Sequence, residues 1–269
     1  MTDYVVVGGG SAGCVLANRL SANPDVEVTL IEAGGRDSSP FIGMPAGYFQ
    51  LIKTGQIDWG YYTEPQQHLL GRRLYWPRAK VLGGCSCING MVYIRGSATD
   101  YDNWEAMGNS EWSFKDCLPY FLKSENWNGP NSAIHGKGGP LYTSRYGVQH
   151  PLSKAFVEAG VQAGYPYRDD FNGGEQEGFG PCDSTIKADG EKGVRSSTAF
   201  AYIHPVKDRK KPQDHHQGAG HPRHRRAWSG GWGRVSSPWP QANHSRRPGS
   251  SAVGRCHQFA AAAAIVWNW

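Results

Sequence analysis

The 269-residue chain contains no run of about eighteen apolar residues, the length that a helix needs to cross a lipid bilayer. Its first residues, Met1-Thr2-Asp3, lead directly into a strand-like segment and have neither the basic stretch nor the cleavage site of a secretory signal. These absences favour a soluble, cytoplasmic protein over a membrane or secreted one. The length is sufficient for a core without disulfides, in one large domain or two small ones.

Cysteine pairs with the spacing of a metal or redox site are also missing. No Cys-x-x-Cys pair occurs, and Cys85 and Cys87 are closer together than usual zinc ligands. On an extended segment these two side chains would point to opposite faces, which argues against a redox dithiol. We therefore predict reduced thiols and no metal site. The six cysteines are Cys14, Cys85, Cys87, Cys117, Cys182 and Cys256.

Acidic residues are missing from the last part of the chain. Residues 1–206 hold 17 lysines and arginines against 21 aspartates and glutamates, a net charge of −4. Residues 207–269 hold 11 against 2, a net charge of +9, and no acidic residue follows Asp214. Aliphatic residues almost disappear there before a final alanine-rich run. Such a segment has little periodicity from which a core could form, so we predict a disordered tail.

The opening residues have the pattern of a strand, a helix and a second strand. Tyr4–Val7 is a short β-branched run, and the glycine-rich residues 8–13 follow it. Apolar residues then recur at helical spacing until residues 21–24 stop the pattern. Residues 26–31 are typical of a buried parallel strand, which ends at Glu32 and completes a βαβ unit of about 30 residues.

Three glycines of this unit have predicted roles. Gly8 permits a tight turn, Gly10 lets the backbone approach a pyrophosphate at the helix N-terminus, and Gly13 lets the helix pack closely on the sheet. Glu32 can accept hydrogen bonds from the ribose hydroxyls of an adenosine. A turn without a ligand is the alternative, but the complete unit favours a bound dinucleotide. It does not distinguish FAD from NAD, although Ala33-Gly34-Gly35 favours FAD.

A second motif occupies residues 78–96, with the sequence RAKVLGGCSCINGMVYIRG. Paired glycines followed by small residues let the main chain pass close to phosphates and a flat ring. Residues 89–92 can present backbone groups to an isoalloxazine. The motif resembles the flavin-proximal signature of the glucose-methanol-choline (GMC) oxidoreductases, and the resemblance spans residues 3–206.

This resemblance implies an α/β fold with an FAD-binding, Rossmann-like domain and the start of an α+β substrate domain. We assign residues 1–150 to the FAD-binding domain, 151–206 to the beginning of the substrate domain and 207–269 to an aberrant tail. The sequence resembles the alcohol and choline dehydrogenase branch, which implies oxidation of a primary alcohol to an aldehyde. The hydride would pass to flavin N5 and the electrons to an unidentified acceptor.

The resemblance also implies the cofactor contacts. Cys85 stands where serine or threonine is more usual, and its similar size should be tolerated. Some members bind FAD through a histidine at the position of Ile88, so FAD should be non-covalent here. The residues expected to contact FAD are Gly8, Gly10, Ser11, Ala12, Gly13, Glu32, Val81, Leu82, Gly83, Gly84, Asn89, Gly90, Met91 and Val92.

Two further helices are expected from local signals. One begins at Ser113, where a Ser-x-x-Asp cap precedes apolar residues, and one covers residues 151–163 and is closed by Gly164. Both are interpreted as structural. Four histidines without an assignable partner fit surface or core positions better than a catalytic base: His68, His135, His150 and His204.

The tail is better explained by a shifted reading frame than by a binding patch. Its histidines, and its arginines interleaved with tryptophans, would otherwise suggest a metal or nucleic-acid site. Residues 212–223 can be back-translated and read from the second base as LKTITKALVTR, an alternating strand pattern. Residues 255–269, with the same one-base shift, give GAINSPQLLQLSGI, which resembles the second GMC signature. We therefore predict that the frame is lost near Lys211.

This shift has a consequence for activity. The resemblance places the catalytic histidine far towards the C-terminus of a chain about twice as long, and no residue here matches the motif of that base. We assign no catalytic residue and expect an inactive chain, with a small-molecule alcohol as substrate of the intact enzyme and no nucleic-acid partner. Two alternatives are an NAD-dependent dehydrogenase, which has no use for residues 78–96, and a non-catalytic nucleic-acid binder with a basic tail.

Overall fold

The computed structural model describes residues 2–145, 150–189, 192–209 and 265–268. They form two compact units, each assembled from separate stretches of the chain. Of the described residues, the first unit contains 2–38, 52–87, 198–209 and 265–268, and the second contains 39–51, 88–145, 150–189 and 192–197. The domain limits expected at residues 150 and 206 follow the order of the chain and stay a prediction.

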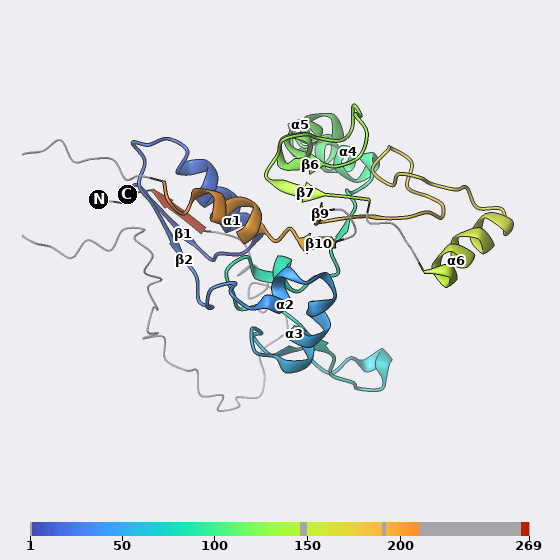
Figure 1. Ribbon diagram of the computed structural model, residues 1–269, viewed down its shortest axis with the longest axis horizontal. Helices are drawn as coiled ribbons and strands as arrows, with labels where there is room; N and C mark the ends of the chain where they lie inside the picture. Colours follow the sequence, from blue (N-terminus) through green and yellow to red (C-terminus); the bar gives the residue numbers. More distant parts are fainter. Residues whose placement is uncertain (1, 146–149, 190–191, 210–264, 269) are drawn as a thin grey trace, which may run out of the picture. The chain divides into compact units, whose positions relative to one another are not determined.

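The first unit is built on the strand, helix and strand that open the chain (Figure 1). β1 (Tyr4–Val7) and β2 (Val28–Ile31) pair in parallel along their whole length, and α1 (Ser11–Leu20) connects them. The predicted βαβ unit is therefore confirmed. The second strand begins two residues later than residue 26, because the Val26 amide donates to the Asn23 carbonyl at 3.1 Å and closes a turn.

A third strand extends this sheet on the other side of β1. β11 (Ile265–Asn268) runs antiparallel to β1, so the strand order is β11, β1, β2 (Figure 1). The sequence predicts no strand in the tail, although β-branched and aromatic residues at 265–267 are types that suit one. The disorder predicted for residues 207–269 does not hold for β11, because residues 265–268 form a strand, and residues 210–264 and 269 lie outside the described part of the chain.

Short elements of the first unit pack against α1 and the glycine-rich turn. The π-helical turn η4 (Ala199–Ile203) lies against α1, where Asn18 Nδ2 donates to the Tyr202 carbonyl at 2.6 Å. The remaining elements are β3 (Tyr61–Tyr62), η2 (Gln67–Leu69), β4 (Tyr75–Trp76), η3 (Gly84–Cys87) and η5 (His204–Val206). Buried apolar side chains include Val6, Cys14, Ala17, Val81, Leu82, Cys87, Ala199, Ala201, Tyr202, Ile203 and Val206.

The second unit combines helices with two-stranded sheets in which β5 pairs with β8, β6 with β7 and β9 with β10. Its helices are α4 (Ala98–Ala106), α5 (Phe114–Ser124) and α6 (Pro151–Gln162), and α2 (Pro40–Gly43), η1 (Pro45–Gly47) and the start of α3 (Tyr48–Thr54) precede them. Its strands are β5 (Val92–Tyr93), β6 (Glu125–Trp127), β7 (Leu141–Thr143), β8 (Asp183–Ser184), β9 (Ile186–Asp189) and β10 (Lys192–Arg195).

Both helices expected in this unit are present. Ser113 caps α5, with its Oγ accepting the Asp116 amide at 3.3 Å, and α6 ends before Gly164, which has a φ of +96°. His150 caps α6 by accepting the Leu152 amide, so this histidine has a structural role. Within the described ranges, no helix combines the length and the apolar character needed to span a membrane.

Candidate cofactor site

The glycines of the opening turn occupy the conformations that a close helix–strand crossing requires. Gly8 has a φ of +96°, in the left-handed region that favours glycine. A Cβ on Gly13 would lie 1.8 Å from the Gly8 carbonyl oxygen, so only glycine fits there. A Cβ on Gly10 would meet no atom within 4 Å, which leaves the space beside this residue open. The turn therefore combines a tight crossing with an open approach at Gly10.

The N-terminus of α1 has the features of an anion site. Its N-cap is Gly10, which has no side chain to cap the helix, and its first turn holds no acidic residue. Ser11 and Ala12, the first two helical residues, are exposed. Amides at a helix N-terminus point along the axis and carry partial positive charge, which favours a phosphate.

Glu32 ties the glycine-rich turn to the segment after β2. Its Oε2 accepts the Gly9 amide and its Oε1 accepts the Gly34 amide, each at 2.7 Å. The carboxylate is thereby fixed beside the turn, with lone pairs left over, because each carboxylate oxygen can accept more than one hydrogen bond. Its expected bond to a ribose stays a prediction.

The structure brings the second motif against the first. The Gly83 amide donates to the Gly9 carbonyl at 2.7 Å, and a Cβ on Gly84 would lie 2.9 Å from the Gly10 Cα. Gly83 and Gly84 have φ values of +92° and +54°, and the neighbouring Val81 and Leu82 side chains are buried. Two glycine-rich loops about seventy residues apart in sequence therefore pack against each other at the start of α1.

A hydrogen-bonded clasp that the sequence did not predict fixes the second loop. The Ser86 hydroxyl donates to the Gly83 carbonyl at 2.6 Å and accepts the Thr198 amide at 2.9 Å. Thr198 Oγ1 also donates to the Gly83 carbonyl, at 3.2 Å. Thr198 lies within the span of the family resemblance, but the sequence gives no indication of this contact.

The last four expected cofactor residues, 89–92, belong to the second unit. Met91 has a φ of +64°, its amide donates to Asn89 Oδ1 at 3.2 Å, and its carbonyl accepts the Thr185 amide at 2.8 Å. Val92 begins β5 and is 60% exposed. These contacts give the segment a defined backbone, with Gly90 at its centre.

The extended conformation expected for the Cys-x-Cys pair is wrong. Cys85 and Cys87 lie on the 3-10 turn η3 rather than on an extended segment. Their side chains still differ, because Cys85 is exposed whereas Cys87 is fully buried and donates to the Leu82 carbonyl at 3.3 Å. Every cysteine in the described part of the chain is a free thiol, and Cys256 lies outside it.

These exposures predict the pattern of thiol labelling. Cys85 should react with iodoacetamide in the folded protein, whereas Cys14 and Cys87 should react only after unfolding. Burial raises the pKa of Cys14 to about 12, so its reactive thiolate is scarce in the folded state. Mass spectrometry of labelled peptides at about pH 8, with and without urea, measures this. Equal labelling of Cys14 and Cys85 without urea would contradict the structure.

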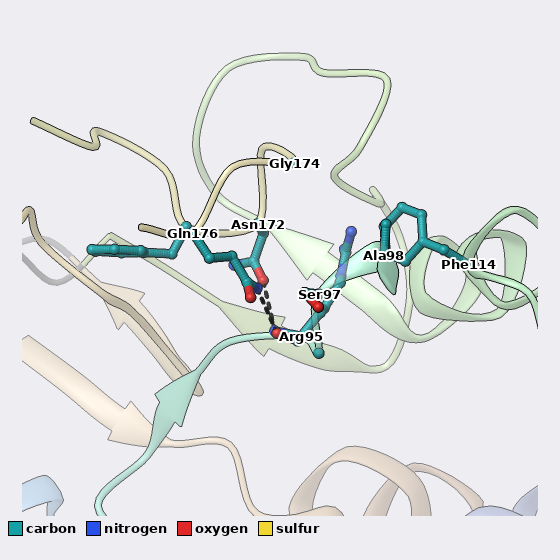
Figure 2. Close-up of a pocket in the computed structure, with 9 residues that line it drawn as sticks. Arg95, Ser97, Ala98, Phe114, Asn172, Gly174 and Gln176 are labelled. Atoms are coloured by element: carbon teal, nitrogen blue, oxygen red, sulfur yellow. Dashed lines mark hydrogen bonds between the residues drawn. The ribbon is translucent and has the colours of Figure 1, made fainter. Parts of the chain in front are cut away.

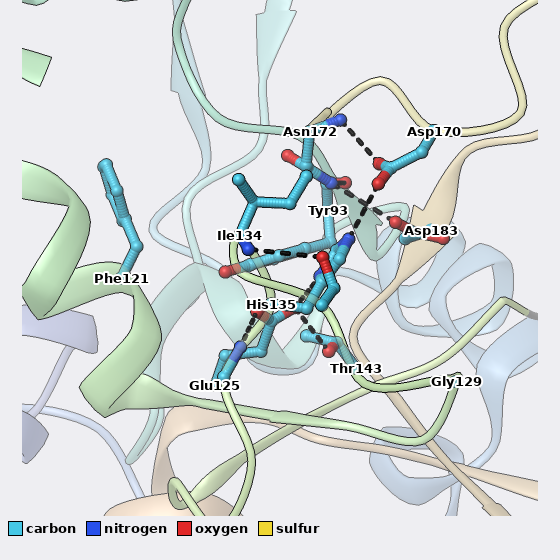
Figure 3. Close-up of polar contacts among 12 residues, drawn as sticks. Tyr93, Phe121, Glu125, Gly129, Ile134, His135, Thr143, Asp170, Asn172 and Asp183 are labelled. Atoms are coloured by element: carbon cyan, nitrogen blue, oxygen red, sulfur yellow. Dashed lines mark hydrogen bonds and ion pairs between the residues drawn. The ribbon is translucent and has the colours of Figure 1, made fainter. Parts of the chain in front are cut away.

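A buried network of charged side chains lies in the second unit (Figure 3). Glu125 has no exposed surface and accepts Arg95 Nη2 at 2.9 Å, the Gly136 amide at 2.9 Å and Thr143 Oγ1 at 2.8 Å. The His135 ring stacks on Trp127, with centroids 4.4 Å apart.

The His135 imidazole lies between two carboxylates. Its Nδ1 is 3.0 Å from Glu125 Oε1 and its Nε2 is 3.0 Å from Asp170 Oδ2 (Figure 3). Burial alone would lower the pKa of His135, but the bonds to both carboxylates raise it. Burial alone would raise the pKa of Glu125, but the hydrogen bonds from His135, Gly136 and Thr143 lower it. These contacts therefore favour the protonated form of His135 and the ionised form of Glu125.

The two pKa shifts define a pH window for the stability of this network. The raised pKa of His135 gives stability that is fully present below its ordinary value of 6.5 and is lost as the pH rises through the raised value. The lowered pKa of Glu125 gives stability that is present above its ordinary value of 4.5 and is lost as the pH falls through the lowered value.

We therefore expect His135→Asn to cost most stability at about pH 5 to 6.5, where both charges are present, and less in alkaline solution. Urea unfolding of the wild type and of His135→Asn, from about pH 5 to about pH 9, measures the difference in stability. A cost that increased from about pH 6 to about pH 9 would contradict the assigned charge state.

Three residues of the same network have the side-chain types and the spacing of metal ligands, but their hydrogen bonds argue against a metal site. His135, Asp170 and Asp183 each place one ligand atom within 4.8 Å of the others. However, His135 Nε2 is already bonded to Asp170, and Asp183 accepts the cationic Arg145 at 3.4 Å. A cation beside a carboxylate disfavours a second cation there. We interpret the cluster as an ion network, and the absence of a metal stays a prediction.

A small pocket lies at the N-terminal end of α4 (Figure 2). Asn172 Oδ1 accepts the Arg95 amide at 2.9 Å and Gln176 Nε2 donates to the Arg95 carbonyl at 2.7 Å along its wall. Its space of about 10 Å³ holds roughly one water molecule. Ligand pockets are more than ten times larger, so this pocket is too small for a flavin or its substrate.

His204 pairs with Asp37 in the first unit. Its Nε2 lies 2.9 Å from Asp37 Oδ2, and the hydrogen bond to this carboxylate raises the pKa of the histidine. His68 lies on η2 and is exposed. The ion pair of His204 is partly exposed and Lys207 lies near it, so we assign neither histidine as a base.

The βαβ unit and the paired glycine loops define an α/β protein of the Rossmann-like class. Comparison with family models is more specific, because the GMC oxidoreductase model matches residues 2–212. The chain belongs to the GMC oxidoreductase family. This membership does not favour an NAD-dependent dehydrogenase or a basic-tail nucleic-acid binder.

Two curated relatives illustrate the match. An oxygen-dependent choline dehydrogenase of Vibrio vulnificus (strain YJ016) is 48% identical over 209 residues, which cover 77% of this chain and 37% of the relative. An alcohol dehydrogenase (acceptor) of Pseudomonas putida is 49% identical over 210 residues, which cover 78% of this chain and 37% of the relative. The chain therefore spans little more than a third of the length of these relatives.

Solved structures also match most of this chain with a smaller part of their own length. Pyridoxine 4-oxidase from Mesorbium loti superposes with a TM-score of 0.71 at 40% identity, over 77% of this chain and 40% of that one. An FAD-dependent oxidoreductase from Chaetomium thermophilum superposes with a TM-score of 0.69 at 33% identity, over 76% of this chain and 37% of that one.

Proposed function

We propose that this chain carries the FAD-binding part of an oxidoreductase that acts on CH–OH groups. The observation that carries the proposal is the contact between the two glycine-rich loops, in which the Gly83 amide bonds to the Gly9 carbonyl and Gly84 lies against Gly10. Both loops pass close to the N-terminus of α1, where a pyrophosphate would be stabilised by amides and the helix dipole. FAD, when bound, supplies the acceptor for a hydride from the alcohol carbon.

The residues that would hold FAD divide by the chemistry that they offer. Gly8 to Gly13 would surround the pyrophosphate, and Glu32 would accept hydrogen bonds from the ribose hydroxyls. Val81 to Gly84 would provide close backbone approach, and the buried Val81 and Leu82 side chains would hold this loop in place. Residues 89–92 would present backbone groups to the isoalloxazine, and Ile88 offers no atom for a covalent bond, so FAD would be held non-covalently.

The substrate class follows from the relatives. Three of the four reported above are named for choline, alcohol and pyridoxine, which are small molecules with a hydroxyl group. We infer a small alcohol as substrate of the intact enzyme, its oxidation to an aldehyde and an unidentified electron acceptor. No residue of this chain is assigned as the base, and we expect the chain alone to be inactive with alcohols and an artificial acceptor.

The binding proposal is tested with the full 269-residue chain. Purified protein mixed with FAD and freed of excess cofactor should retain a flavin absorbance at about 450 nm, which nicotinamide cofactors lack. Denaturation should release all of the flavin, because the bond is non-covalent. Protein that retains NAD but no flavin would overturn the assignment.

The shifted frame is a separate proposal with its own test. Nucleotide sequencing of the gene should reveal a site near Lys211 where inserting or deleting one base opens a long frame through the second GMC signature. A gene expressed with that correction should yield a longer flavoprotein that oxidises an alcohol. The frame proposal is wrong if no single-base change near this position extends the family sequence.

A further inference from the structure

The segment at residues 89–92 has a backbone that needs support. Met91 has a φ of +64°, a conformation that is costly for a residue with a side chain. Its amide donates to Asn89 Oδ1 at 3.2 Å, so the orientation of the Asn89 side chain helps to hold the bend. The proposed function places this segment at the flavin ring, where its backbone groups must point in defined directions.

Arg195 fixes Asn89 from the end of β10. Its Nη1 donates to both the backbone carbonyl and the side-chain Oδ1 of Asn89, at 2.8 and 2.7 Å. Its Nε donates to the Ile42 carbonyl at 3.0 Å, which anchors the guanidinium on its other side. Arg195 is only 1% exposed, so these bonds form away from water and hold a rigid planar group in place.

We propose that Arg195 is the positioning residue of the flavin-proximal segment 89–92. It holds the Asn89 carbonyl and amide oxygen together, and Asn89 in turn receives the Met91 amide and keeps the left-handed bend. Lysine would keep the charge but not the planar fork that binds Asn89 and Ile42 at once. This role of Arg195 rests on the proposed function, because the segment positions a ligand only when a flavin is bound.

A second buried arginine in the same unit provides a matched control. Arg95 is 6% exposed and donates to the Ile134 carbonyl and to Glu125, and its guanidinium stacks on the Tyr93 and Phe121 rings rather than on residues 89–92. Replacing it should destabilise the unit without loosening this segment. Comparing the two arginines therefore separates a role in positioning from a general contribution to stability.

The experiment uses the 269-residue chain as wild type, Arg195→Met, Arg195→Lys and Arg95→Met. FAD affinity is measured by flavin fluorescence, and amide exchange is measured by mass spectrometry on peptides that cover residues 89–92 and 125–136. We expect Arg195→Met to weaken FAD binding about tenfold or more and to speed exchange at 89–92. Arg195→Lys should show a smaller change of the same kind. Arg95→Met should speed exchange at 125–136 and leave FAD affinity within about threefold of wild type.

Each outcome decides the proposal. It is overturned if Arg195→Met, or Arg195→Lys when the methionine variant does not fold, keeps wild-type FAD affinity and wild-type exchange at residues 89–92. It is also overturned if Arg95→Met weakens FAD binding as much as Arg195→Met does. If wild-type protein binds no FAD, the proposed function fails and the flavin role of Arg195 fails with it. That result is distinct from a wild type that binds FAD and an Arg195 variant that binds it equally well.

Discussion

Replacing Glu125 by alanine is expected to lower the free energy of unfolding by about 3–5 kcal/mol. The glutamate is fully buried and is the shared acceptor of Arg95, His135 and Thr143. Without it, the buried guanidinium loses its counter-charge and the imidazolium keeps a carboxylate only at Nε2. Removing one partner of a buried ion pair is costly because the remaining charge stays out of water. Urea unfolding at about pH 6, where the network is charged, measures the loss.

The control for this experiment is a variant of Asp169, the exposed partner of a neighbouring ion pair. Asp169 binds Arg145 at 2.7 Å, but its side chain is 69% exposed. Asp169→Asn should therefore cost about 1 kcal/mol or less, as is usual for surface pairs. Glu125→Gln should fall between the two, because it keeps the volume and some hydrogen bonds but loses the charge. If Glu125→Ala cost no more than Asp169→Asn, the buried network would contribute little to stability.

Gly13→Ala is expected to be the most damaging single-methyl change in the first unit. The added Cβ would lie 1.8 Å from the Gly8 carbonyl oxygen, and neither atom can rotate away because the backbone fixes both positions. We expect α1 to shift from β1 and the free energy of unfolding to fall by about 3 kcal/mol, the upper end of the usual cost of overpacking. Thermal or urea unfolding of the apoprotein measures this cost without any cofactor.

Gly10→Ala is the matched variant, since it adds the same methyl group three residues earlier. Its Cβ would meet no atom within 4 Å and its φ of −74° suits alanine, so stability should change by about 0.5 kcal/mol or less. The methyl group would instead occupy the approach proposed for the pyrophosphate, and FAD affinity should fall about tenfold or more. A Gly10→Ala protein that binds FAD as tightly as wild type would show that this turn does not receive the phosphates.

The opening βαβ unit could be predicted because its determinants are local. A β-branched run, a glycine turn and a helical repeat follow one another within residues 4–31, and each acts on its own neighbours. The error in the start of β2 has an equally local cause. Val26 is a residue type that favours strands, but its amide closes a turn with the Asn23 carbonyl. The second motif was placed beside the first only through the family resemblance, since no local signal joins residues so far apart in sequence.

The contacts that fix the site could not be predicted because they join distant residues without a repeating pattern. His135 has no local sign of a partner, yet it binds Glu125 ten residues before it and Asp170 thirty-five residues after it. Arg195 reaches Asn89 across 106 positions, and a single arginine at a strand end looks like any surface cation. Buried charges of this kind are recognised from tertiary structure, where desolvation and partners are visible together.

The clasp between Ser86 and Thr198, and the bond from Asn18 to Tyr202, also concern how this protein is made. Their partners lie 112 and 184 positions apart, so strand β1 and helix α1 leave the ribosome long before η4 is synthesised. At usual rates of translation, the wait between Asn18 and Tyr202 is about 10–40 s. During that interval the faces of α1 and of the Gly83 loop that η4 later covers are open to other contacts. The strand and helix that are synthesised first are thus among the last elements to be fully packed. Chaperone capture of nascent chains should therefore be greatest before residue 206 has emerged.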